Sequence, residues 1–313
     1  MSITVKQSIS VTGFIITLVG AILFSTKAII VKLAFISTHT NALTLLTLRM
    51  LFSLPFYLVA AFVVSSRSSN VKLTKREWAF VLGLGVIGYY LSSLFDFIGL
   101  QYISAGLERL ILFLYPTFAV FINAYFFKQL ISRVQRVALT LTYAGIGLAY
   151  FGELAIDSSN PNFYFGSFMV FLCAVTYAIY IVGSGRVIPR IGSTKFTAYA
   201  MLVATCGIFA HFAVAGETAT FQLGKELWVY GLLLAVVATV IPSFMLSYGL
   251  KSIGSNNVAI ISGIGPVSTI MQAYFILGER IVFEQMVGTA LVIAGVILIG
   301  WKRKPIIVKE VAV

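Results

Sequence analysis

The sequence predicts an all-α polytopic membrane protein with ten transmembrane helices, arranged as two inverted five-helix repeats. Of its 313 residues, 59% are hydrophobic and only 10% are charged, whereas soluble globular domains have about 45–50% and about 25%. The hydrophobic residues also form uninterrupted stretches of about 20 residues, which is the length that an α-helix needs to cross a bilayer. An internal repeat, described below, predicts the inversion.

Ten apolar spans follow one another along the chain, separated by short polar loops. They cover approximately residues 12–35, 41–64, 78–100, 105–127, 134–152, 164–185, 196–215, 227–250, 256–277 and 284–301. The first span exceeds the roughly 7–15 apolar residues of a cleavable signal peptide, so it is expected to be a membrane helix. No loop is long enough to form a soluble domain.

The distribution of Lys and Arg predicts the orientation. Sixteen of these 22 residues fall on the side of the two termini, four lie within spans, and only Lys225 and Arg280 fall on the opposite side. Basic residues favour cytoplasmic loops, so both termini are expected in the cytoplasm and the chain in the cell (inner) membrane. The net charge of +12 therefore reflects topology, and no nucleic-acid partner is expected.

The chain repeats itself after 150 residues. Residues 78–148 align with 228–298 without a gap. The matched pairs include Trp78 with Trp228, Pro116 with Pro266, and Gln135 with Gln285. We therefore divide the chain into repeats at 1–152 and 153–313. Because each repeat holds an odd number of spans, the second enters the membrane inverted, as in transporters that work by alternating access.

Several short motifs carry a resemblance to a known family. They are Lys27–Ala34 at the end of the first span, Leu48-Arg49-Met50, Gly99–Ala105, Gly265-Pro266, and Leu277-Gly278-Glu279-Arg280. In this order they resemble the ten-helix EamA type of the drug/metabolite transporter superfamily. The resemblance implies a secondary transporter, commonly an exporter of metabolites, amino acids or drugs. The first repeat departs from the pattern at Phe127–Leu130, so no role for a glutamate is carried over there.

Charged residues within the spans are the candidate site, because each costs about 2.5–3.5 kcal/mol to insert. They are Lys27, Lys32, Arg49, Asp96, Glu108 and Arg109. Lys32 is close enough to the surface to extend into water. The others form either a buried ion-pair network or the lining of a cavity for an anionic or zwitterionic solute, in which the guanidinium of Arg49 suits a carboxylate or phosphate.

Asp96 has two possible roles. It ends a polar stripe with Tyr89, Ser92 and Ser93 at helical spacing. In that place its carboxyl group could carry a coupling proton or form a salt bridge with a nearby Lys or Arg. Tyr89 and Tyr180 complete the predicted substrate-binding set.

Three prolines within spans, Pro116, Pro242 and Pro266, are predicted to kink or hinge their helices. The sequence has no nucleotide-binding P-loop and none of the common motifs for catalysis or metal binding, so no enzyme activity, cofactor or metal is expected. The predicted partners are a small-molecule substrate, the lipid bilayer and a possible second copy. The alternatives to a secondary transporter of a small metabolite are a membrane scaffold or receptor, and an antiporter of nucleotide sugars or sugar phosphates.

The orientation is testable by labelling single cysteines in a variant that lacks Cys173 and Cys206. We expect an impermeant thiol reagent to label intact cells carrying Lys225→Cys but not Lys75→Cys, because the two positions lie on opposite sides. Labelling at position 75 from outside would refute the orientation.

Overall fold

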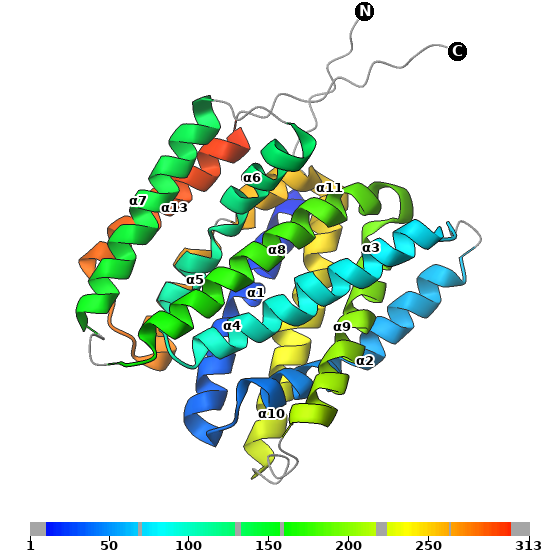
Figure 1. The fold of residues 1–313 in the computed structure, drawn as a ribbon, viewed down its shortest axis with the longest axis horizontal. Coiled ribbons are helices and arrows are strands. Elements are labelled where there is room, and N and C mark those ends of the chain that lie inside the picture. The colour runs from blue at the N-terminus through cyan, green and yellow to red at the C-terminus, as the bar shows by residue number, and fades with distance from the viewer. Residues whose placement is uncertain are drawn as a thin grey trace, which may run out of the picture.

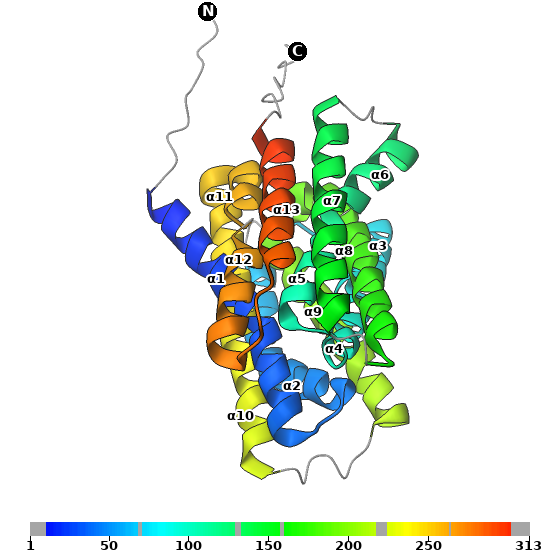
Figure 2. The ribbon, with the colours of Figure 1, turned by 90° about the vertical axis from the view of Figure 1, so that its left-hand side faces the viewer.

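A computed structural model describes residues 11–67, 71–128, 133–156, 160–216, 224–262 and 264–301. All regular structure within these residues is helical, and the helices form the bundle in Figures 1 and 2. The first half contains α1 (Val11–Thr38), α2 (Ala42–Ser65), α3 (Lys75–Gly85), η1 (Val86–Leu91), α4 (Ser92–Leu100), α5 (Ala105–Leu112), α6 (Tyr115–Phe127) and α7 (Arg133–Ile156). The second contains α8 (Phe163–Ile191), α9 (Ser193–Ala215), α10 (Gly224–Ala235), η3 (Val236–Val240), α11 (Ile241–Ser262), α12 (Gly265–Gln272), η4 (Ala273–Leu277) and α13 (Phe283–Trp301).

Seven helical runs among the described residues are long and apolar enough to cross a membrane. They are α1, α2, Lys75–Leu100, Ala105–Phe127, α8, α9 and Gly224–Leu246. These runs match the first four and the sixth to eighth of the expected spans, so the prediction of a helical, multi-pass membrane protein is confirmed. The expected spans 134–152, 256–277 and 284–301 fall on α7, on α11 to η4, and on α13, and the number of ten stays a prediction.

Local sequence signals set where several helices begin. The side chain of Asn41 accepts a hydrogen bond from the backbone N–H of Thr44 (2.8 Å) at the start of α2. Thr74 and Glu77 bond reciprocally to each other's backbone N–H before α3, which satisfies two N–H groups that the helix leaves without a partner. At the start of α5, the Ser104 hydroxyl accepts a hydrogen bond from the backbone N–H of Leu107 (3.0 Å). These three helices therefore start at residue types that favour that position.

The described residues contain three wider π-helical turns, η1, η3 and η4, which the spacing of apolar residues did not predict. Two of them, η1 and η3, begin 150 residues apart, at Val86 and Val236. Pro242 lies within the continuous helical run Gly224–Leu246, directly after η3, and its predicted role as a kink or hinge stays a prediction. Pro116 and Pro266 are each the second residue of a helix, α6 and α12, that begins after a turn. Proline suits the first turn because its missing N–H would have no partner there.

The most extensive contacts join helices of the first half to helices of the second half: α7 with α13, α1 with α11, α2 with α9, and α4 with α8. α7 and α13 lie side by side in both views (Figures 1 and 2). They approach so closely that a Cβ atom at Gly145 would overlap the carbonyl oxygen of Gly288, and the reverse also holds. Glycine at both positions therefore allows these two helices to pack.

This close approach gives a test of the packing. Gly145→Ala should destabilise the protein by about 1–3 kcal/mol, because the added methyl group forces the two helices apart. Gly147→Ala is the matched control, since its Cβ would meet nothing within 4 Å. The thermal unfolding of both variants in detergent checks this, and equal melting temperatures would contradict the packing described for α7 and α13.

Candidate functional site

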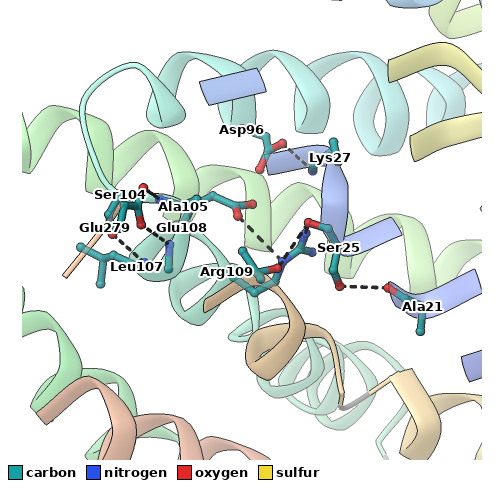
Figure 3. A network of polar contacts seen from close by, with 12 residues as sticks. Ala21, Ser25, Lys27, Asp96, Ser104, Ala105, Leu107, Glu108, Arg109 and Glu279 are labelled. Atoms are coloured by element: carbon teal, nitrogen blue, oxygen red, sulfur yellow. Dashed lines mark hydrogen bonds and ion pairs between the residues drawn. The ribbon is translucent and has the colours of Figure 1, made fainter. Parts of the chain in front are cut away.

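Lys27 of α1 and Asp96 of α4 form a buried ion pair at the centre of the candidate site (Figure 3). The Lys27 Nζ atom lies 2.5 Å from an Asp96 carboxylate oxygen, and the two side chains are only 8% and 1% exposed. The sequence left open whether Asp96 pairs with a Lys or an Arg, and its ion-pair partner in the structure is Lys27. The pair therefore ties α1 to α4 and neutralises two charges that lipid would not tolerate.

Glu108 and Arg109 bring a second pair of opposite charges into the same place from α5. Both side chains are buried, and Arg109 Nε lies 3.9 Å from a Glu108 carboxylate oxygen. Arg109 also donates hydrogen bonds to the Thr269 hydroxyl (3.1 Å) and to the backbone carbonyl of Ser25 (3.4 Å). Arg109 therefore joins α5 to α1 and to α12, which belong to different halves of the chain.

The carboxyl groups of Asp96 and Glu108 are both buried in this cluster. No hydrogen-bond donor among the described residues serves the two oxygens of Glu108. A protonated carboxyl group carries its own donor, whereas an ionised one can only accept. These carboxyl groups therefore offer a place where a proton can bind.

Arg49 of α2 is the third buried cation, and its contacts differ from those of the other two. Its Nε donates to the Thr239 hydroxyl of η3 (2.8 Å), and one terminal nitrogen donates to the Ser93 hydroxyl of α4 (3.3 Å). The guanidinium also lies over the ring of Phe97, 5.6 Å from its centre. Within the part of the chain that the structure describes, no carboxylate forms an ion pair with it. Its charge is thus held by neutral groups.

Tyr89 and Tyr180 meet across the two halves. The Tyr180 hydroxyl donates to the Tyr89 hydroxyl (2.9 Å), and their rings lie 4.8 Å apart, edge to face. This contact depends on Gly88, because a Cβ atom there would overlap the Tyr180 ring. The structure therefore brings these two predicted residues together, one from η1 and one from α8.

The polar stripe that ends at Asp96 does not make one continuous contact. Tyr89 and Ser92 contact α8, whereas Ser93 contacts α2 and Asp96 contacts α1. The π-helical turn η1 changes the register of the helix just before Ser92. The helical spacing in the sequence assumed a regular α-helix and therefore predicted that these side chains share one face, whereas they contact three different helices.

Glu279 is a contact residue that the sequence analysis missed. Its carboxylate accepts hydrogen bonds from the backbone N–H groups of Ala105 (3.0 Å) and Gly106 (3.4 Å) at the start of α5 (Figure 3). A carboxylate is favourable there because the N-terminus of a helix carries partial positive charge. The motif around Glu279 was noted only as a family signal. Its partner lies 174 residues away and no sequence pattern joins the two.

A second group of contacts between the halves lies at the start of α3, and Figure 1 shows α3 and α5 at different places in the bundle. Arg190 forms a salt bridge with Glu77 (2.9 Å) and donates to the carbonyl of Lys72 (3.1 Å). Lys195 donates to the carbonyl of Val71 (2.6 Å). The two halves are thus joined both at the start of α5 and at the start of α3. The charged cluster is buried from water; it consists of Lys27, Arg49, Asp96, Glu108 and Arg109.

These contacts define what the site can do. It holds one guanidinium, that of Arg49, without an ion-paired carboxylate among the described residues, and two buried carboxyl groups, those of Asp96 and Glu108. The described residues contain no group of three or more His, Cys, Asp or Glu that could hold a metal ion.

Comparison with known proteins gives a family match over most of the chain. The sequence model of the EamA-like transporter family matches residues 11–151 and 164–301. A protein of Bacillus subtilis (strain 168) called "Uncharacterized transporter YcbK" is 31% identical over 281 residues, which is 88% of each chain. An "Uncharacterized transporter" of Archaeoglobus fulgidus is 24% identical over 223 residues, 71% of this chain and 76% of the relative.

The fold also has a counterpart among solved structures. One crystal structure of a protein superposes with a TM-score of 0.65, covering 92% of this chain and 95% of that chain. The two sequences are 17% identical, so the likeness concerns the fold alone.

The Lys27–Asp96 pair can be tested by a double-mutant cycle. Asp96→Asn should destabilise the protein by about 3–5 kcal/mol, because it leaves a buried lysine charge without its partner. Lys27→Met combined with Asp96→Asn should recover much of that loss, since neither charge remains. Unfolding in detergent measures these two variants and Lys27→Met alone.

The control for this cycle is Arg190→Gln, which removes a bridge whose arginine side chain is 50% exposed and should cost less than about 1 kcal/mol. If the double variant is as unstable as the sum of the two single variants, the two charges are not coupled and the pair has no structural role.

Proposed function

Because the chain belongs to the EamA-like transporter family of the drug/metabolite transporter superfamily, we propose that it is a secondary active transporter that moves a small metabolite across the cell membrane by alternating access. The substrate carries a carboxylate or phosphate group, as an amino acid does, and it leaves the cell or is exchanged. The relatives described above are named transporters, which supports this assignment over a scaffold or receptor.

The proposed architecture is ten transmembrane helices in two inverted repeats, residues 1–152 and 153–313, with both termini in the cytoplasm. Two findings support it. The family model matches two stretches of similar length, and η1 and α6 begin 150 residues before η3 and α12, respectively. Inverted repeats provide two equivalent arrangements of the same contacts, one open to each side of the membrane.

The buried charge of Arg49 is the observation that carries the choice of substrate. Lys27 and Arg109 each form an ion pair with a carboxylate, but Arg49 has only hydroxyl and aromatic partners among the described residues. A buried cation without an anion is costly, and an arginine binds a carboxylate or phosphate through two parallel hydrogen bonds. A substrate anion would supply the missing charge, and its binding would be strengthened by the low dielectric around it.

The two groups of contacts between the halves act as gates in this proposal. The contact of Glu279 with the start of α5 closes the side that the distribution of Lys and Arg assigns to the exterior. The salt bridge between Arg190 and Glu77 closes the cytoplasmic side. The gates open in turn, so that the site never connects both sides. The Asp96–Glu108 pair is where a coupling proton would bind, although exchange of one solute for another would need no proton.

The proposal predicts transport without ATP. The purified protein in sealed proteoliposomes preloaded with a panel of unlabelled carboxylates and phosphates should take up the labelled form of its substrate by exchange. Empty liposomes are the control. Uptake that requires ATP on either side would contradict a secondary transporter.

Arg49→Lys tests the proposed substrate contact. Lysine keeps the charge but loses the paired donors, so affinity for the identified substrate should fall about tenfold or more while the melting temperature changes little. Binding to the purified variant, measured beside its thermal unfolding, checks this. Unchanged binding together with a lowered melting temperature would make Arg49 a structural residue and withdraw the preference for an oxyanion.

A further inference from the structure

A surface groove lies along the outer side of α2, away from the charged cluster. It encloses about 460 Å³ and is lined mainly by α2, with Thr194 of α9 and Phe244 of α11 on its other side. Apart from Thr194 and Arg67, its lining side chains are apolar, and Phe56 and Val59 are 45% and 63% exposed. We call it the α2 groove. α2 is one of the helices able to span a membrane, and apolar side chains exposed on such a helix are expected to face lipid.

The length of the α2 groove matches one leaflet of a bilayer. Its lining runs from Pro55 to Arg67, a distance of about 18 Å at about 1.5 Å per helical residue. The hydrocarbon core of a bilayer is about 30 Å thick, so half of it is about 15 Å. The groove therefore extends from the end of the helix to the middle of the membrane, as an acyl chain does.

The charge of the α2 groove lies at one end only. Arg67 follows the last turn of α2 and is exposed, and the segment after it carries Lys72, Lys75 and Arg76. Phosphate headgroups lie at this depth, and anionic lipids are attracted to Lys and Arg next to a membrane helix. An apolar trough that ends at an arginine is thus complementary to a lipid with an acyl chain and an anionic headgroup.

We propose that the α2 groove binds one anionic phospholipid, with an acyl chain along Phe56 and Val59 and its phosphate on Arg67. The bound lipid would also connect the two halves of the protein. Beneath the groove, the Tyr57 hydroxyl of α2 is hydrogen-bonded to the Ser243 hydroxyl of α11 (3.1 Å). An acyl chain packed over this contact shields it from competing groups, so the lipid stabilises the arrangement in which α2 and α11 meet. This inference does not depend on the identity of the transported solute.

The test is lipid binding to the full-length protein, stripped of lipid in detergent and titrated with phosphatidylglycerol or phosphatidylcholine of the same acyl chains. Native mass spectrometry counts the bound lipids. Wild type should bind one phosphatidylglycerol about fivefold more tightly than phosphatidylcholine, the effect of about one basic residue at a membrane surface. Arg67→Gln should abolish this preference. Val59→Trp fills the groove from an exposed position and should weaken binding of both lipids.

Arg76→Gln is the matched control, because it removes the same charge near the same end of α2 without lining the groove. It should keep the preference for phosphatidylglycerol. The proposal is overturned if Arg67→Gln keeps that preference, if Arg76→Gln loses it equally, or if Val59→Trp binds both lipids as wild type does. The last two results would indicate attraction to the surface in general, or a lipid bound elsewhere.

Discussion

The high cost of a charge in a low-dielectric interior is the constraint on which this structure depends. Six ionisable residues lie within the apolar spans, and five of them are buried in one region. The contacts that these side chains make hold several helices in place. Lys27 with Asp96 ties α1 to α4, Arg109 with Thr269 joins α5 to α12, and Arg49 with Thr239 joins α2 to η3. Helices far apart in the chain are thus held together by the ion pairs and hydrogen bonds of single buried side chains.

The same constraint links structure to transport. Two cations of the cluster have anionic partners within the protein, and the third, Arg49, is held by hydroxyl groups. In the proposed function, a substrate anion supplies its counter-charge. An anion that enters changes the charge balance of the cluster. It can therefore alter the relative stability of two arrangements of the halves, which a ligand with equal affinity for both could not do. In the proposed transport cycle, the contacts around Glu279 and around Arg190 at the two ends of the bundle break one at a time.

Much of the fold could be predicted from the sequence, because hydropathy and the positions of basic residues act over whole segments. The family was also identified from the order of short motifs, and the match over both halves confirms it. The details that depend on hydrogen-bond register were missed. The wider turn at η1 moves Tyr89 relative to Asp96, and the interruption before Pro116 divides one expected helix in two. Apolar spacing carries no information on either.

The candidate site was predicted in part for the same reason. A charge within an apolar span is conspicuous in a sequence, so the five charged residues of the cluster were found. The uncharged partners Thr239 and Thr269 and the contact of Glu279 were not, because these are common residue types in ordinary positions. Glu279 acts on the backbone N–H groups of Ala105 and Gly106, and backbone groups leave no mark in a sequence. Contacts across 160 to 190 residues become visible only in the folded chain.

Alternating access requires that the contacts at the two ends of the bundle open in turn around the buried charges. Distances between paired spin labels measure this, with one pair at positions 101 and 280 beside the Glu279 contact and another at 76 and 193 beside the Arg190 contact. In proteoliposomes, we expect each pair to have a short and a long distance, and we expect conditions that lengthen one to shorten the other. Two pairs that stay short under all conditions, or that lengthen together, would contradict alternating access.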